Sequence, residues 1–189
     1  TRVHLEEDTG RLIHDRDSGS TLVDFNRAGV ALMELVTEPD FRTGEEVRWF
    51  GEELQRILRY VGASDANMEK GQMRVEVNIS LRPLGAEEFG TKVEVKNINS
   101  FKFAADAVQC EIKRQSALLE RGEKIIQETR GWNDHTQETF SQRVKESAHD
   151  YRYFPEPDLP PCALSREMVE EIRATVPELP AAKRVRFAK

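Results

Sequence analysis

Cysteine is scarce in this sequence: only Cys110 and Cys162 occur among its 189 residues. They lie far apart, and neither has a second cysteine or a histidine at metal-ligand spacing, which excludes a disulfide scaffold and a zinc knuckle. No apolar run approaches the roughly 18 residues of a membrane span, and no signal segment opens the chain. We therefore expect a cytoplasmic globular protein that does not bind a membrane.

An excess of basic residues is also missing. The chain has 28 Lys and Arg residues against 34 Asp and Glu residues, a formal charge of −6, which argues against a broad basic face for non-specific nucleic-acid binding. Neither a Walker glycine loop nor a Gly-x-Gly-x-x-Gly motif is present. A nucleotide would therefore have to be held on a sheet face by a metal ion and side chains.

In the first half of the chain, apolar residues follow the strand period in some segments and the helical period in another. Residues 1–38 read as short strands separated by polar turns, which is typical of an antiparallel meander. A capping box at 43–46 and an apolar stripe predict a helix that stops at Gly62. Alternation of apolar and polar residues predicts strands over 72–82 and 92–96, which we expect to pair antiparallel.

The middle of the chain continues this mixture. Ser100 can cap a second helix that ends near Gly122, and residues 125–132 and 138–144 flank a polar turn as a hairpin would. Strands in pairs with two helices inserted indicate an α+β fold, in which helices cover one face of an antiparallel sheet.

The last forty residues differ from the rest. Proline is frequent from Tyr151 to Pro161, which excludes a regular helix or central strand there, and short helices are expected at 165–174 and 181–187. We therefore expect one domain over 1–162 and a second, truncated one over 163–189. Since the chain starts with Thr rather than Met, inside an expected strand, we also expect a piece of a longer polypeptide.

Charged side chains gather on the open face of the predicted sheet. Those of the two alternating strands are Arg74, Glu76, Asn78, Lys92, Glu94 and Lys96. Solvent exposure is the simplest interpretation, and phosphate binding is the alternative. The candidates for neutralising phosphates are Arg27, Arg74, Lys96 and Arg152. Asn99 precedes a helix N-terminus, where an anion could bind, although simple capping explains it equally.

Two carboxylates near the start of the chain are candidates for a metal site. Glu34 lies within the apolar run 31–36, where an ionised carboxylate is costly to bury without a partner. One alternative is an edge position with the carboxylate in solvent. The other is that Glu34 and Glu7, on neighbouring strands, ligate one hard cation such as Mg²⁺ through oxygen.

Several longer stretches point to one family. They are LVDFNRAG (22–29), LMELVTEPD (32–40), EVKNINSF (94–101), QETRGW (127–132) and DYRYFPEPDLPP (150–161). Together they resemble the B subunit of the aspartyl/glutamyl-tRNA amidotransferase, and the resemblance covers nearly the whole chain.

The resemblance implies ATP-dependent transamidation of misacylated Glu-tRNA(Gln), Asp-tRNA(Asn) or both. In that family, the B subunit uses ATP and Mg²⁺ to phosphorylate the side-chain carboxylate of the aminoacyl-tRNA. Ammonia then displaces the phosphate. The ammonia comes from glutamine hydrolysed by the amidase, which is the A subunit, and a small C subunit completes the heterotrimer. The enzyme is a carbon–nitrogen ligase with glutamine as amido donor.

The resemblance also implies a fold and site residues. Residues 1–162 correspond to a cradle domain similar to glutamine synthetase, without its N-terminal portion, and 163–189 to the start of a helical domain. Glu7 and Glu34 match the catalytic Mg²⁺ ligands. The residues expected to line the nucleotide or substrate face are Arg74, Asn78, Glu94, Lys96 and Asn99. Departures from the family pattern are Ala31 for Pro, Lys70 for an acidic residue and Glu76 for Asp. Without the remaining segments, we expect the chain alone to be inactive.

Two other functions compete with this one. A non-catalytic scaffold or tRNA-docking domain of the same complex would keep normal activity after Glu34→Gln. A stand-alone metal-dependent hydrolase would need a general base or an activated nucleophile, and the sequence offers no evident candidate.

Overall fold

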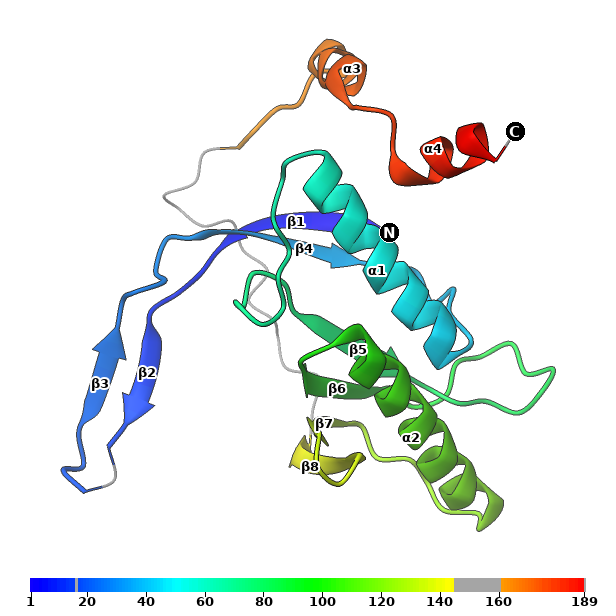
Figure 1. Ribbon diagram of the computed structural model, residues 1–189. Coiled ribbons are helices and arrows are strands. Elements are labelled where there is room, and N and C mark those ends of the chain that lie inside the picture. The colour runs from blue at the N-terminus through cyan, green and yellow to red at the C-terminus, as the bar shows by residue number, and fades with distance from the viewer. Residues whose placement is uncertain (16, 145–160, 189) are drawn as a thin grey trace. The chain divides into compact units, whose positions relative to one another are not determined.

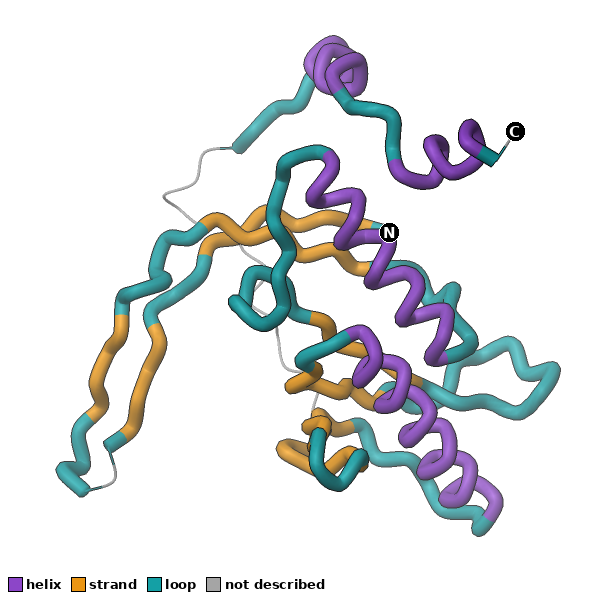
Figure 2. The backbone as a smooth tube through the Cα atoms, in the orientation of Figure 1, coloured by secondary structure: helices purple, strands orange, loops and turns teal. Residues whose placement is uncertain are grey.

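The computed structural model describes residues 1–15, 17–144 and 161–188, which form two compact units, Thr1–Phe41 and Arg42–Lys189 (Figures 1 and 2). The greater part of the DYRYFPEPDLPP stretch, with Arg152, lies outside the described residues.

The first unit is a long two-stranded ribbon. Its strands are β1 (Arg2–Glu7), β2 (Arg11–His14), β3 (Thr21–Asp24) and β4 (Ala31–Val36). β1 pairs with β4, and β2 pairs with β3, both antiparallel. The predicted meander is therefore wrong. The polar segments between the strands face each other instead of turning: the Asp8 N–H donates to Val30 O at 2.8 Å and the Gly29 N–H to Asp8 O at 2.8 Å. They continue the ribbon toward its tip.

Helix α1 (Gly44–Tyr60) opens the second unit as predicted. Thr43 Oγ1 accepts from the Glu46 N–H at 3.2 Å, and Glu46 Oε2 accepts from the Thr43 N–H at 2.9 Å, which completes the capping box. A Cβ on Gly44 would lie 2.5 Å from the Ala105 carbonyl oxygen. The absence of a side chain at Gly44 therefore lets α1 approach helix α2 (Phe101–Glu120) closely.

The sheet of the second unit has four strands in the order β5-β6-β7-β8. They span Val75–Ile79, Val93–Ile98, Glu128–Asn133 and Glu138–Val144. The β5/β6 and β7/β8 pairs are antiparallel as predicted, but β6 and β7 run parallel. The prediction of an antiparallel sheet is thus wrong at its centre. Two parallel neighbours need a crossover connection, and α2 supplies it.

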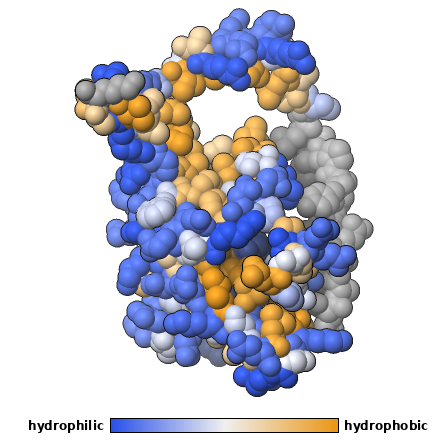
Figure 3. Space-filling view, turned by 90° about the vertical axis from the view of Figure 1, so that its right-hand side faces the viewer, coloured by the Kyte–Doolittle hydropathy of each residue, from blue (hydrophilic) through white to orange (hydrophobic). Residues whose placement is uncertain are grey.

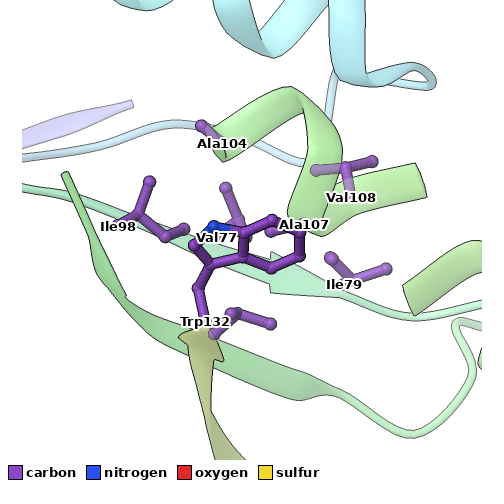
Figure 4. Close-up of a cluster of buried hydrophobic side chains, with 8 residues drawn as sticks. Val77, Ile79, Ile98, Ala104, Ala107, Val108 and Trp132 are labelled. Atoms are coloured by element: carbon purple, nitrogen blue, oxygen red, sulfur yellow. The ribbon is translucent and has the colours of Figure 1, made fainter. Parts of the chain in front are cut away.

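The core lies between this sheet and α2. Figure 4 shows most of its members: Val77, Ile79, Val95, Ile98, Ala104, Ala107, Val108 and Trp132. Trp132 of β7 is only 1% exposed and packs beneath the small alanines of α2. The α+β class is confirmed, with α2 on one face of the sheet and α1 against α2. The glutamine synthetase-like cradle stays a prediction.

Helices α3 (Arg166–Thr175) and α4 (Pro180–Phe187) follow, both as predicted. α4 contacts α1 through an ion pair in which Arg184 Nη2 lies 3.0 Å from Glu53 Oε2. Hydrophilic residues cover much of the face seen in Figure 3, with apolar patches between them. Among the described residues, none of the helices combines the length and apolar character that crossing a bilayer requires. The domain boundary after residue 162 stays a prediction.

Candidate functional site

One group of possible metal ligands lies on the ribbon of the first unit. His4 pairs with Glu34 across β1 and β4, and His4 Nδ1 lies 3.4 Å from Glu34 Oε2 and 4.0 Å from Glu6 Oε1. One ligand atom from each of the three lies within 4.8 Å of the others. Alternation along β1 puts His4 and Glu6 on one face, and pairing puts Glu34 on that same face.

Glu7 does not belong to this group. It pairs with Ala31, and its odd position on β1 directs it to the ribbon face opposite to that of His4 and Glu34. The register thus separates the two predicted Mg²⁺ ligands, and their joint role stays a prediction. The neighbour of Glu34 depends on strand register, which the sequence alone did not supply.

A second polar group crosses three strands on the sheet face turned away from α2. Lys96 Nζ on β6 lies 3.0 and 2.9 Å from the two carboxylate oxygens of Glu76 on β5, and 3.5 Å from Glu94 Oε1. Thr129 on β7 donates its hydroxyl to Glu94 Oε2 at 2.9 Å. Although partial burial opposes it, the hydrogen bond to Glu76 and the charges of Glu76 and Glu94 raise the pKa of Lys96. Lys96 is therefore firmly cationic.

Two other predicted residues share this face. Asn78 pairs directly with Glu94 across β5 and β6, so the two side chains extend from the same face of the sheet. Arg74 precedes β5, two residues before Glu76, and is exposed. The structure thus brings Asn78, Glu94 and Lys96 together, with Arg74 at the edge of the same face.

Asn99 lies away from that group. Asn97 has a φ of 63°, and the β5/β6 register shifts there as in a bulge. The chain then enters α2, where the Ser100 hydroxyl accepts from the Phe103 N–H at 3.0 Å. Asn99 Nδ2 lies 3.5 Å from Asp134 Oδ2. This end of α2 is therefore capped by Ser100 and already has a carboxylate beside it.

Arg27, the remaining described candidate for phosphate binding, is engaged elsewhere. Its Nε donates to Asp8 Oδ2 at 2.8 Å within the ribbon of the first unit. It helps to hold the two strands where they bend toward the tip.

Sequence reasoning missed a buried ionic network on the α2 side of the sheet. Glu111, fully buried on α2, accepts two hydrogen bonds from Arg114 at 2.9 and 2.8 Å and lies 3.1 Å from Arg130 Nε on β7. Although burial opposes it, hydrogen bonds from Arg114, Gln115 and Thr139 lower the pKa of Glu111. One feature of the sequence could have indicated this network: a polar residue, Gln115, lies within the apolar stripe of α2. The network joins helix to sheet.

Comparisons with a family model and with curated proteins point to the same family. The family model described as "GatB/GatE catalytic domain" matches residues 1–170. The chain is 55% identical over 99% of its length to the B subunit of aspartyl/glutamyl-tRNA(Asn/Gln) amidotransferase from Nostoc sp.. It is also 55% identical, over its full length, to the protein of that name from Carboxydothermus hydrogenoformans. It spans only 39% and 40% of these relatives.

Proposed function

Because the chain belongs to the GatB/GatE catalytic domain family, we propose that it is part of the B subunit of a tRNA-dependent amidotransferase and serves its ATP-dependent step. The names of the relatives support this assignment. In the proposal, the full-length protein works with an amidase and with a small third subunit on misacylated Glu-tRNA(Gln) or Asp-tRNA(Asn). The chain alone is inactive.

The proposed reaction activates a carboxylate for amide formation. A side-chain carboxylate is a poor acceptor for ammonia, because its leaving group would be an oxide. Attack of a carboxylate oxygen on the terminal phosphorus of ATP releases ADP and gives an acyl phosphate. Ammonia then adds to the carbonyl carbon, phosphate leaves and a proton is lost. Positive groups around the transferred phosphoryl group stabilise its transition state.

The observation that carries the proposal is the group around Lys96. A sheet face that holds a cationic Lys96, with Asn78 opposite Glu94 and Arg74 at its edge, has donors suited to phosphate oxygens. The formal charges of Glu76 and Glu94 cancel those of Lys96 and Arg74, so the group offers phosphates no excess of positive charge. A divalent cation would supply the positive charge that a nucleotide triphosphate needs, and this balance supports the proposed use of Mg²⁺.

The ribbon of the first unit, taken by itself, has candidate ligands for a divalent cation. Glu6 and Glu34 present exposed carboxylate oxygens on one face, and carboxylate oxygens are the ligands that Mg²⁺ prefers. His4 adds a nitrogen that suits Mg²⁺ less well, and it would instead orient Glu34. Mg²⁺, when bound, would neutralise phosphate charge. The role of Glu7 as a ligand rests on the family resemblance alone, and because Glu7 lies on the other face of the ribbon it would act apart from Glu6 and Glu34.

The test uses the full-length protein assembled with the amidase and the small third subunit. Glu34→Gln and Lys96→Met should each lower ATP-dependent phosphorylation of the aminoacyl-tRNA by at least about 100-fold, while glutamine hydrolysis continues. Lys102→Met is the matched control, because Lys102 lies exposed on α2 and its one ion pair among the described residues is with Asp106, at 3.8 Å. Normal phosphorylation in both variants would favour the scaffold function.

A further inference from the structure

Thr129 occupies an unusual place in the polar group of the sheet. It lies on β7 directly beside Glu94 of the parallel strand β6, and its hydroxyl donates to Glu94 Oε2 at 2.9 Å. Thr129 is only 5% exposed. Its side chain is on the face away from α2, because pairing puts it on the same side as Glu94 and Lys96. The hydroxyl therefore serves the polar face rather than the apolar core.

The Thr129 hydroxyl stabilises the Glu94 carboxylate. The Glu94 side chain is 17% exposed, so water solvates the carboxylate poorly, and a poorly solvated carboxylate is stable only when protein donors replace the water. Thr129 binds Oε2, and Oε1 faces Lys96 Nζ at 3.5 Å. The hydroxyl thereby fixes which carboxylate oxygen is presented to the ammonium.

The position of Lys96 depends in turn on the two carboxylates. Glu76 holds its ammonium from β5 and Glu94 from its own strand. On β7, the residue beside Lys96 is Gly131, which brings no charge. A Cβ at Gly131 would lie 2.6 Å from Gln142 Nε2 and from Phe140 Cζ. The side chains of β8 therefore leave no room for a larger residue at this position. Gly131 thus provides no side chain that could hold Lys96. The influence of β7 on Lys96 passes through the Thr129 hydroxyl and the Glu94 carboxylate.

We propose that Thr129 is a positioning residue for Lys96, acting through the carboxylate of Glu94. The assignment rests on the proposed function, in which Lys96 meets the phosphoryl group. Valine has nearly the shape of threonine and would pack equally well beside Glu94. Only the hydroxyl distinguishes the two, so the pair Thr129→Val and Thr129→Ser separates positioning from packing.

A direct test reads the titration of Lys96 itself. In the full-length protein, lysines are converted to ¹³C-dimethyl-lysine, and the Lys96 signal is assigned by its loss in Lys96→Met. We expect Thr129→Val to lower the pKa of Lys96, because Glu94 turns away and its charge no longer favours the ammonium form. Thr129→Ser should leave it at the wild-type value. An unchanged titration in Thr129→Val overturns the proposal.

A second readout comes from the assembled complex with ATP and misacylated tRNA. Thr129→Val should lower kcat for phosphorylation about 10-fold, the effect of one misplaced charged group, with little change in the KM for ATP, and Thr129→Ser should restore it. A purely structural role would instead lower the melting temperature and leave the titration unchanged. If Thr129→Val does not fold, Thr129→Ala replaces it.

The two readouts separate this proposal from the function on which it rests. In one outcome, the pKa of Lys96 changes in Thr129→Val while Lys96→Met still phosphorylates normally. That result keeps Thr129 as the residue that orients Glu94 but rejects the role of Lys96 in phosphoryl transfer, and with it the positioning role in catalysis. If instead the pKa of Lys96 is unchanged in Thr129→Val and Lys96→Met is impaired, the positioning role of Thr129 is rejected and the proposed function stands.

Discussion

Replacing Glu111 by Gln should weaken the junction of α2 with the sheet severely. The wild-type carboxylate accepts from Arg114, Gln115 and Thr139 at 2.6–2.9 Å and lies 3.1 Å from Arg130. Glutamine keeps the shape but removes the charge and turns one acceptor into a donor that faces other donors. Breaking a buried ion pair from one side costs roughly 3–5 kcal/mol.

The structure places Glu111→Gln near the lower end of that range. Arg130 keeps a second carboxylate, since its Nη1 lies 2.6 Å from Glu128 Oε1, and Arg114 is partly exposed and can recruit water. We therefore expect a loss of about 3 kcal/mol in the local free energy of unfolding. Such a loss corresponds to a rise of roughly two orders of magnitude in the population of the open state.

Hydrogen exchange in the full-length protein measures this loss where it occurs. Amides of α2, β7 and β8 should exchange roughly 100-fold faster in Glu111→Gln, because exchange of protected amides follows the local opening equilibrium. Glu120→Gln, at the exposed end of the same helix, is the matched control and should leave the rates unchanged. An increase below about 10-fold for Glu111→Gln would refute the argument that the network holds the helix to the sheet.

Three further predictions concern the same unit. The pKa of Glu111 is lowered in the folded state, so its stabilising contribution is present above the ordinary carboxyl pKa and is lost as pH falls through the lower, folded value. On acidification, the protection of α2 amides, corrected for intrinsic exchange, should therefore fall more in wild type than in Glu111→Gln. The same pH dependence of protection in both proteins would contradict this. Gly44→Ala should lower the melting temperature by an amount equivalent to about 1–3 kcal/mol, since the new Cβ meets the Ala105 carbonyl at 2.5 Å; an unchanged melting temperature would show that the helices can separate freely. Thr43→Ala should cost about 1 kcal/mol and speed exchange in the first turn of α1, where the hydroxyl caps the Glu46 N–H; equal rates in that turn would mean that the cap contributes nothing.

Local patterns predicted local structure well. The capping box at Thr43 and Glu46 marked the start of α1, and alternation from Val75 to Ile79 marked β5. Both signals lie within a few residues of the structure they encode. The predicted pairing of β5 with β6 also held, because both strands alternate and a turn-rich segment separates them.

The features that sequence reasoning missed depend on distant partners. The parallel direction of β7 follows from the path of α2, and no residue of Glu128–Asn133 encodes it. Glu34 meets His4 only through a register that joins residues thirty positions apart. Glu111 reads as an ordinary helical acid until Arg130 and Thr139 are placed beside it. Such burial of a charge cannot be inferred before its partners are known.

The crossover made by α2 also has a consequence for the order of folding. Glu94 and Thr129 are separated by 35 positions, whereas the β7/β8 hairpin closes over a four-residue turn. Contacts that close long loops form late, because their entropic cost must be met before they add stability. We therefore expect the hairpin to form first and the polar group around Lys96 to be completed only after α2 has docked.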